Sequence, residues 1–219
     1  MKVLVIAAHP DDEILGCGGT IARHTAKGDD VYVLIMSEGV SAQYEDKEKF
    51  LKLRRDACLK ATKYLGVKEV FFDEFPDGKL DSISQLEINK KIEGVIAKVN
   101  PQRVYTHHHG DLNKDHRIVH DSTLIATRRN VQEVFSYEIL GSTNKCADNK
   151  EMIFVPNYYV SIDKYLDKKL KALSFYETEV KNFPNPVSEE AIKVLAKHRG
   201  VESGLNAAEA FVCIKKIEE

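Results

Sequence analysis

The start of the chain constrains the fold most, because an apolar run there ends abruptly in a cluster of ionisable side chains. Residues Val3 to Ala8 are all apolar and three of them are β-branched, which is typical of a buried parallel strand. Pro10 ends this strand, since proline has no N–H for a ladder of hydrogen bonds. The imidazole and three carboxylates of residues 9–13 therefore follow the carboxyl end of a central strand, where open α/β sheets bind ligands. The simplest alternative is that an aspartate here only caps the next helix.

Strand-like and helical segments alternate over the first 130 residues. Strands are predicted at residues 3–8, 31–36, 70–72 and 103–106, and helices at 12–27, 45–65, 82–99 (or 84–99) and 115–128. This alternation predicts a Rossmann-like, three-layer α/β/α fold with a mostly parallel sheet. In its strand order 3-2-1-4, the first and fourth strands are neighbours, and a crevice opens between their carboxyl ends.

The remaining residues are predicted to form a less regular C-terminal extension. It contains strand-like stretches at 133–140, 153–162 and 210–215, and helices at 163–180 and 188–200. The sequence has no internal repeat, no low-complexity tract and no clear boundary. We therefore expect a single domain over residues 1–219.

A second polar cluster follows the predicted fourth strand. Residues 107–120 hold five of the eight histidines, together with Asp111 and Asp115. A histidine triplet such as 107–109 can belong to an ordinary surface loop. Here it mirrors residues 9–13, because both clusters follow strands that should be neighbours, and they should therefore face each other across one pocket. Histidine and carboxylate ligands suit Zn²⁺ or another divalent metal.

Composition excludes several other classes of protein. The net charge of −2 provides no basic excess for nucleic acid, and no apolar run is long enough to span a membrane. The N-terminus lacks the basic region of a signal peptide, and the glycines at 16–19 lie within a predicted helix rather than in a dinucleotide-binding turn. The four cysteines, Cys17, Cys58, Cys146 and Cys213, have no C-x-x-C spacing, so free thiols in a reducing cytoplasm are expected. Homo-oligomerisation stays open.

With both clusters in view, the chain resembles the LmbE-like (PIG-L) family of zinc-dependent N-acetylglucosamine deacetylases. The resemblance rests on Ala-His-Pro-Asp-Asp-Glu at residues 8–13 and Asp-Leu-Asn-Lys-Asp-His-Arg at residues 111–117, and it extends over nearly the whole chain. It implies hydrolysis of the N-acetyl group of an N-acetylated amino sugar, with release of acetate and a free amine.

The resemblance also implies roles for individual residues. His9, Asp12 and His116 would hold zinc, and Asp11 would be the general base. Asp115 would orient a nearby histidine. Glutamate 13 would be structural, at the start of the following helix.

One departure from the family pattern affects the catalytic assignment. Many members carry a histidine three positions before the last metal ligand, where this chain has Asn113. One residue of the triplet 107–109, with His108 favoured, would then stabilise the oxyanion or protonate the leaving amine. Arg54 falls near an arginine that contacts substrate in relatives, although a solvated helix face also explains it.

Two other functions fit the same residues. The chain could be another metal-dependent amidase, acting on a thiol conjugate, or a non-enzymatic metal- or nucleotide-binding module on a Rossmann-like scaffold. Asp11 argues for an enzyme, because a simple metal site needs no spare carboxylate beside its ligand. His120 follows His116 by four residues, but a zincin motif needs glutamate at the position of Arg117. We therefore expect a core or supporting role for His120.

Overall fold

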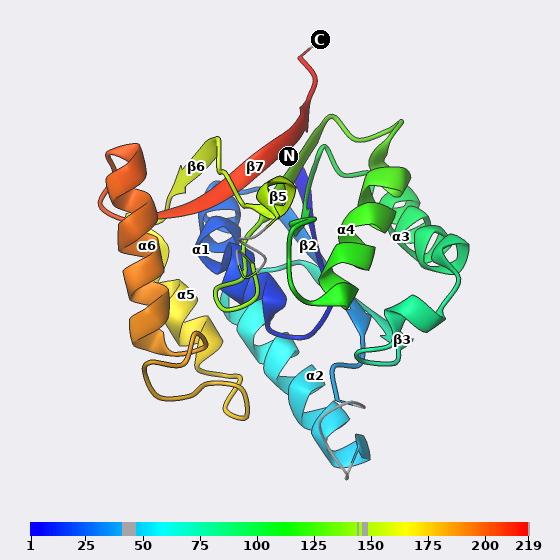
Figure 1. The fold of residues 1–219 in the computed structure, drawn as a ribbon, viewed down its shortest axis with the longest axis horizontal. Coiled ribbons are helices and arrows are strands. Elements are labelled where there is room, and N and C mark those ends of the chain that lie inside the picture. The colour runs from blue at the N-terminus through cyan, green and yellow to red at the C-terminus, as the bar shows by residue number, and fades with distance from the viewer. Residues whose placement is uncertain (41–46, 144, 146–148, 219) are drawn as a thin grey trace.

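The computed structural model describes residues 1–40, 47–143, 145 and 149–218. Its centre is one sheet with the strand order β3-β2-β1-β4-β5-β7-β6 (Figure 1). The strands are β1 (Lys2–Ala7), β2 (Asp30–Ser37), β3 (Glu69–Phe75), β4 (Arg103–His107), β5 (Glu133–Tyr137), β6 (Tyr158–Ser161) and β7 (Ala208–Lys216). Strands β1 to β5 are parallel, and β7 pairs antiparallel with both β5 and β6. The predicted order 3-2-1-4 and the mostly parallel sheet are confirmed.

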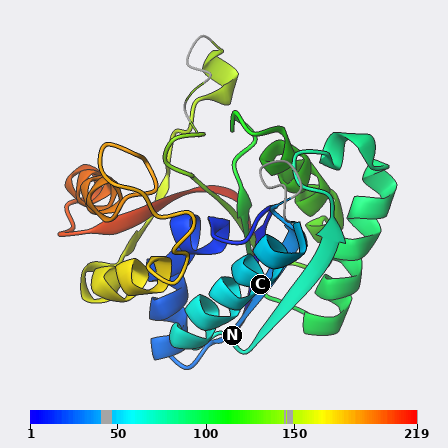
Figure 2. The same ribbon diagram turned by 90° about the horizontal axis from the view of Figure 1, so that it is seen from below.

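Helices cover both faces of the sheet. They are α1 (Asp12–Ala26), α2 (Lys47–Tyr64), α3 (Gln85–Val99), α4 (Lys114–Thr127), α5 (Leu166–Leu173) and α6 (Glu189–Ser203). Helices α3 and α4 lie on one side of the sheet, with α1, α2 and α5 on the other (Figure 1). Helices α5 and α6 lie on the α1 side of the molecule, where β7 begins (Figure 2). No helix in the described part of the chain is both long enough and apolar enough to cross a membrane.

The central strand β1 is apolar on both of its faces because both faces of the sheet are buried there. Its side chains alternate between two cores, with Val3 and Val5 packed on the α1 side and Leu4 and Ile6 on the α3 side. All four are fully buried. Because successive side chains of a strand point to opposite faces, a strand covered on both sides becomes a continuous apolar run.

The C-terminal third differs from its prediction in extent. The predicted helix 163–180 is confirmed only over α5: a 3₁₀ turn at Asp163–Tyr165 precedes it, and turns replace the helix after Leu173. There Tyr176 is buried with its hydroxyl on the Glu13 carboxylate. The predicted strand 153–162 shrinks to β6, because Pro156 cannot donate to a ladder.

The described cysteines are free thiols. Cys17 and Cys58 are buried and Cys213 is partly exposed. Cys146 and the first two residues of the predicted helix 45–65 lie outside the described residues.

Candidate metal centre

Two loops at the carboxyl ends of neighbouring strands form the site. Strand β1 pairs directly with β4, so the segment from His9 to Asp12, which follows β1, lies against the loop that follows β4. His116 lies in the first turn of α4, which begins after that loop. The two clusters thus meet as the strand order predicted, although about a hundred residues separate them in sequence.

Three donor atoms form a nearly equilateral triangle. The Nδ1 atom of His9 lies 3.2 Å from Oδ2 of Asp12 and 3.3 Å from Nε2 of His116. The third side, from Nε2 of His116 to Oδ2 of Asp12, is 3.4 Å. Each of the three residues is at most 8% exposed. These atoms form a group that can hold a metal ion.

The triangle fits one face of a tetrahedral zinc site. Zinc–nitrogen and zinc–oxygen bonds of about 2.1 Å at tetrahedral angles place ligand atoms roughly 3.4 Å apart. The three measured separations, 3.2, 3.3 and 3.4 Å, agree with this value. Two imidazoles and one carboxylate are also a donor set that zinc accepts, and three protein ligands leave a fourth position open.

Carboxylates hold the far nitrogen of each histidine. Nε2 of His9 lies 3.2 Å from Oδ1 of Asp77 and 3.3 Å from Oδ2 of Asp115. Nδ1 of His116 lies 3.2 Å from Oδ1 of Asp111. Such contacts fix the ring orientation and the tautomer that turns the other nitrogen toward a metal. The expected position of Asp115 beside a histidine is therefore found in the structure.

Two of these supporting residues were missed by sequence reasoning. Asp77 lies outside both sequence clusters, yet the loop after β3 crosses to the site, where Asp115 accepts hydrogen bonds from the N–H groups of Gly78 and Leu80. Asp111 accepts hydrogen bonds from Ser142 and Thr143, two hydroxyls of a distant loop. Nothing in the local spacing signals these long-range contacts.

Asp11 stands beside the triangle but is not one of its donors. It is 8% exposed and has a φ of 120°, which is rare for a residue with a side chain. Its N–H donates to Oε2 of Glu13 at 3.0 Å, and its Oδ2 accepts from Arg54 at 3.1 Å. Burial raises the pKa of the Asp11 carboxyl well above its usual range, and the Arg54 guanidinium opposes this rise.

Arg54 is more fully engaged than a free substrate-binding arginine. Its guanidinium donates to the carbonyl groups of Gly39 and Pro10 as well as to Asp11, and the residue is only 3% exposed. It does line the pocket. The contacts indicate that Arg54 orients the Asp11 carboxylate and joins it to the loop after β2.

The histidine triplet is not placed as favoured from sequence. The His108 ring packs against Phe154, and its Nδ1 accepts the N–H of Gly110 at 3.0 Å. Burial lowers the pKa of His108 to about 3, so its imidazole is neutral near pH 7. His108 is also not among the described residues that line the pocket. The structure therefore gives it no contact through which to act as a cationic catalyst.

His107 is the triplet member nearest the candidate metal donors. Its Nε2 accepts the N–H of Ala8 at 2.9 Å, and its ring stacks on His116 with 3.9 Å between centroids. His120 is buried, with Nδ1 bonded to the carbonyl oxygen of His107 at 2.7 Å. Neither residue is among the described residues that line the pocket, and both pack against residues that form the site, as expected for His120.

Asn113, which replaces the family histidine, has two features. It caps α4, since its side-chain oxygen accepts the N–H of Asp115 at 2.9 Å. It also lines the pocket. A cap held by the oxygen leaves the amide NH₂ group as the donor available to a ligand.

The pocket over the triangle has a volume of about 240 Å³. The candidate metal residues and Asp11 line one part of it, and a wall from the C-terminal third lines another part. This C-terminal wall consists of residues 139–142, Glu179, Pro186 and Val187.

Metal binding should release protons. Burial lowers the pKa of His116, but Asp12 and Asp111 outweigh it and raise that pKa to about 9. Burial is likewise outweighed at His9, mainly by Asp115 and Asp12, so its pKa is raised. The His116 imidazole is therefore protonated near pH 7 without metal, and the raised pKa of His9 acts in the same direction, so metal binding must displace protons from the site.

We accordingly expect the zinc affinity of the metal-free protein to rise with pH between about pH 7 and 9, by up to tenfold per pH unit for each proton released. Chelator competition at several pH values measures this, and calorimetry in buffers of different ionisation enthalpy counts the protons. An affinity independent of pH would contradict the assignment of both histidines as ligands.

The sheet and the site together define a class: an α/β enzyme with a candidate metal centre of two histidines and one aspartate at the carboxyl edge of its strands. Comparison with known families makes this specific. The chain belongs to the PIG-L (LmbE-like) family, since the model described as GlcNAc-PI de-N-acetylase matches residues 4–127. That segment contains Asp11 and all three candidate metal donors.

Individual proteins agree with this family. An uncharacterized deacetylase, YaiS, of Escherichia coli is 29% identical over 80% of this chain and 90% of its own length. A diacetylchitobiose deacetylase of Thermococcus kodakarensis is 28% identical over 96% of this chain and 82% of its own length. The solved N,N′-diacetylchitobiose deacetylase of Pyrococcus horikoshii has the same fold, with a TM-score of 0.81 at 22% identity over 98% of this chain and 84% of that one.

Proposed function

We propose that the protein is a zinc-dependent N-deacetylase that removes the acetyl group from an N-acetylated amino sugar of the N-acetylglucosamine type. The observation that carries the proposal is the Asp11 carboxylate, which Arg54 holds beside the donor triangle without its belonging to it, while Glu13 accepts the backbone N–H of Asp11. A spare, oriented carboxylate has no use in simple metal storage. The deacetylase names of the relatives support the same reaction class.

The donor residues have a defined part in this reaction. His9, Asp12 and His116 would hold the metal through the three atoms of the triangle. A divalent metal there supplies Lewis acidity, which makes a water molecule more acidic and an amide carbonyl more electrophilic. Zn²⁺ is proposed because the donor set and the atom separations suit it.

Proton transfer falls to Asp11. Its carboxylate accepts the proton of the attacking water and, once protonated, donates it to the leaving nitrogen. Arg54 keeps the carboxylate oriented through both steps. The NH₂ group of Asn113, which lines the pocket, would donate to the carbonyl oxygen of the substrate, in place of the histidine common in the family.

The proposal also covers the setting of the enzyme. We place the whole of residues 1–219 in one domain, and we propose that the protein acts in the cytoplasm, where its buried thiols stay reduced. Self-association into a homo-oligomer is compatible with this activity.

The direct test uses protein stripped by a chelator and then reloaded with zinc. A panel of N-acetylated amino sugars and their glycosides is supplied, together with an acetylated thiol conjugate, and both acetate and the mass of each product are measured. We expect acetate and a free amino sugar only with zinc present. Cleavage of the thiol conjugate alone would favour the other amidase class. No cleavage of any compound by zinc-loaded protein would refute the proposal.

A further inference from the structure

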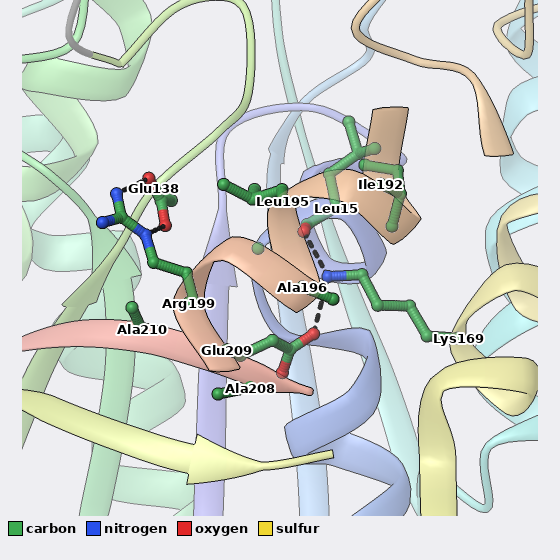
Figure 3. Close-up of a pocket in the computed structure, with 11 residues that line it drawn as sticks. Leu15, Glu138, Lys169, Ile192, Leu195, Ala196, Arg199, Ala208, Glu209 and Ala210 are labelled. Carbon is green, nitrogen blue, oxygen red and sulfur yellow. Dashed lines mark hydrogen bonds and ion pairs between the residues drawn. The ribbon is translucent and has the colours of Figure 1, made fainter. Parts of the chain in front are cut away.

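A buried ion pair outside the pocket connects three elements that are distant in sequence. Lys169 of α5 and Glu209 of β7 are 3% and 6% exposed, and Nζ lies 2.6 Å from Oε1 (Figure 3). A buried charge pair is expensive to desolvate and is often no more stabilising than apolar residues of the same size. The contacts that the pair makes with a third element, α1, therefore need an explanation.

Both side chains bond to the backbone of α1 at the same level of the helix. The Glu209 carboxylate accepts the N–H groups of Gly19 and Thr20 at 2.9 and 2.7 Å. Nζ of Lys169 donates to the carbonyl oxygen of Leu15 at 2.7 Å (Figure 3). In a regular α-helix the Gly19 N–H would donate to that same Leu15 carbonyl. Here each of the two groups also has a charged side-chain partner from outside the helix, so the pair anchors this turn of α1 to α5 and β7.

The glycines of α1 permit this approach. A Cβ atom on Gly18 would lie 3.0 Å from Cγ of Lys169, and one on Gly19 would lie 2.7 Å from Ile162. The stem of the lysine therefore packs directly on the helix backbone. A larger residue at 18 would displace the ammonium group from Leu15.

Leu15 links the ion pair to the metal centre. Its N–H donates to the carbonyl oxygen of Asp11 at 2.9 Å, which closes the first turn of α1. Its side chain lines the pocket. The turn that carries Asp11 and Asp12 therefore ends at the residue whose carbonyl Lys169 holds.

We propose that Lys169 and Glu209 are positioning residues of the metal centre: by bonding to α1 between Leu15 and Thr20, they fix the direction of the turn that supplies Asp11 and Asp12. This inference rests on the metal site of the proposed function. It assigns to α5 and β7, which lie outside the segment matched by the family model, a part in holding that site.

The test compares two isosteric variants at buried or half-buried ion pairs. Glu209→Gln puts an NH₂ group among three donors, so its bonds to α1 and Lys169 cannot all be kept. Glu133→Gln alters the pair with Arg103, whose Nε–Oε2 distance is 2.5 Å, at the opposite end of the sheet from the site. Lys169→Met removes the other partner. Zinc affinity is measured by chelator competition, beside the melting temperature and steady-state kinetics.

We expect Glu209→Gln and Lys169→Met to bind zinc about tenfold or more weakly, as for other groups that orient metal ligands, while Glu133→Gln binds it like the unaltered protein. The kcat value should fall more than KM changes. Zinc affinity within twofold of the unaltered protein in a folded Glu209→Gln variant would overturn the proposal.

A second measurement needs no variant. Zinc loading of the unaltered protein should slow amide hydrogen exchange of residues 15–20, because fixing the first turn fixes the groups bonded to Lys169 and Glu209. Unchanged exchange there would overturn the proposal even if both variants fail to fold. Zinc binding without acetate release would refute the deacetylase function and leave this inference standing, whereas an unaltered protein that binds no zinc would refute both.

Discussion

Asp11→Asn is expected to bind zinc as the unaltered protein does and to lose turnover by about 100-fold to 10,000-fold, the usual contribution of a general base. The amide has nearly the same shape as the carboxylate, so Arg54 and Glu13 can still hold the residue. It cannot accept a proton, however, and Asp11 is the one member of the first cluster that lies at the pocket, outside the donor triangle and within hydrogen-bonding distance of Arg54. Zinc content by mass spectrometry and kcat on the best substrate of the panel give the two required values.

Asp81→Asn is the matched control. Asp81 forms an ion pair with Lys114 on the surface, so its loss should change neither zinc content nor kcat appreciably. If Asp11→Asn keeps most of its activity, Asp11 is not the base, and another group must accept the proton from water.

The second large effect is expected from His116→Ala, which should lose both zinc and activity. Removing one corner of the triangle leaves a histidine and an aspartate, and two protein donors seldom retain zinc against a chelator. The change also removes the ring whose Nδ1 lies 3.2 Å from Oδ1 of Asp111, so some loss of stability is expected as well.

A histidine elsewhere provides the comparison. His198→Ala, on the exposed surface of α6, should retain one zinc per chain and full turnover. Unchanged zinc stoichiometry in His116→Ala would show that the ion binds elsewhere and would remove the basis for the proposed active site.

The position of the site could be predicted from sequence because it depends on two patterns that are visible there: the apolar run of a buried strand and the alternation of strands with helices. The apolar run before His9 had to be a strand buried on both faces, and its end had to meet the end of β4 in the strand order that alternating strands and helices favour. The motifs at residues 8–13 and 111–117 directly follow these two strands, so their side chains were expected to meet. The approach of His9 to His116 needed no knowledge of loops.

The supporting residues could not be predicted in the same way. Asp77 reaches His9 only because the loop after β3 folds across the site, and that path depends on contacts of the whole loop. The position of His108, which does not line the pocket, has a different cause. Strand β4 runs one residue further than predicted, to His107, and the alternation that buries Tyr105 on the α1 side of the sheet places His107 on that side and His108 on the other. A strand predicted one residue longer would have placed His107 and His108 on opposite faces of the sheet.

The C-terminal wall of the pocket has a consequence for how such enzymes diversify. Residues 139–142, Glu179, Pro186 and Val187 border the substrate space but lie outside the family segment 4–127, which contains every candidate donor atom and Asp11. If the proposed function holds, exchanging side chains in this wall would alter which sugar is accepted and leave the candidate metal donors and Asp11 unchanged. New specificities could therefore arise by replacement of these loops, with no change in the candidate metal donors or in Asp11.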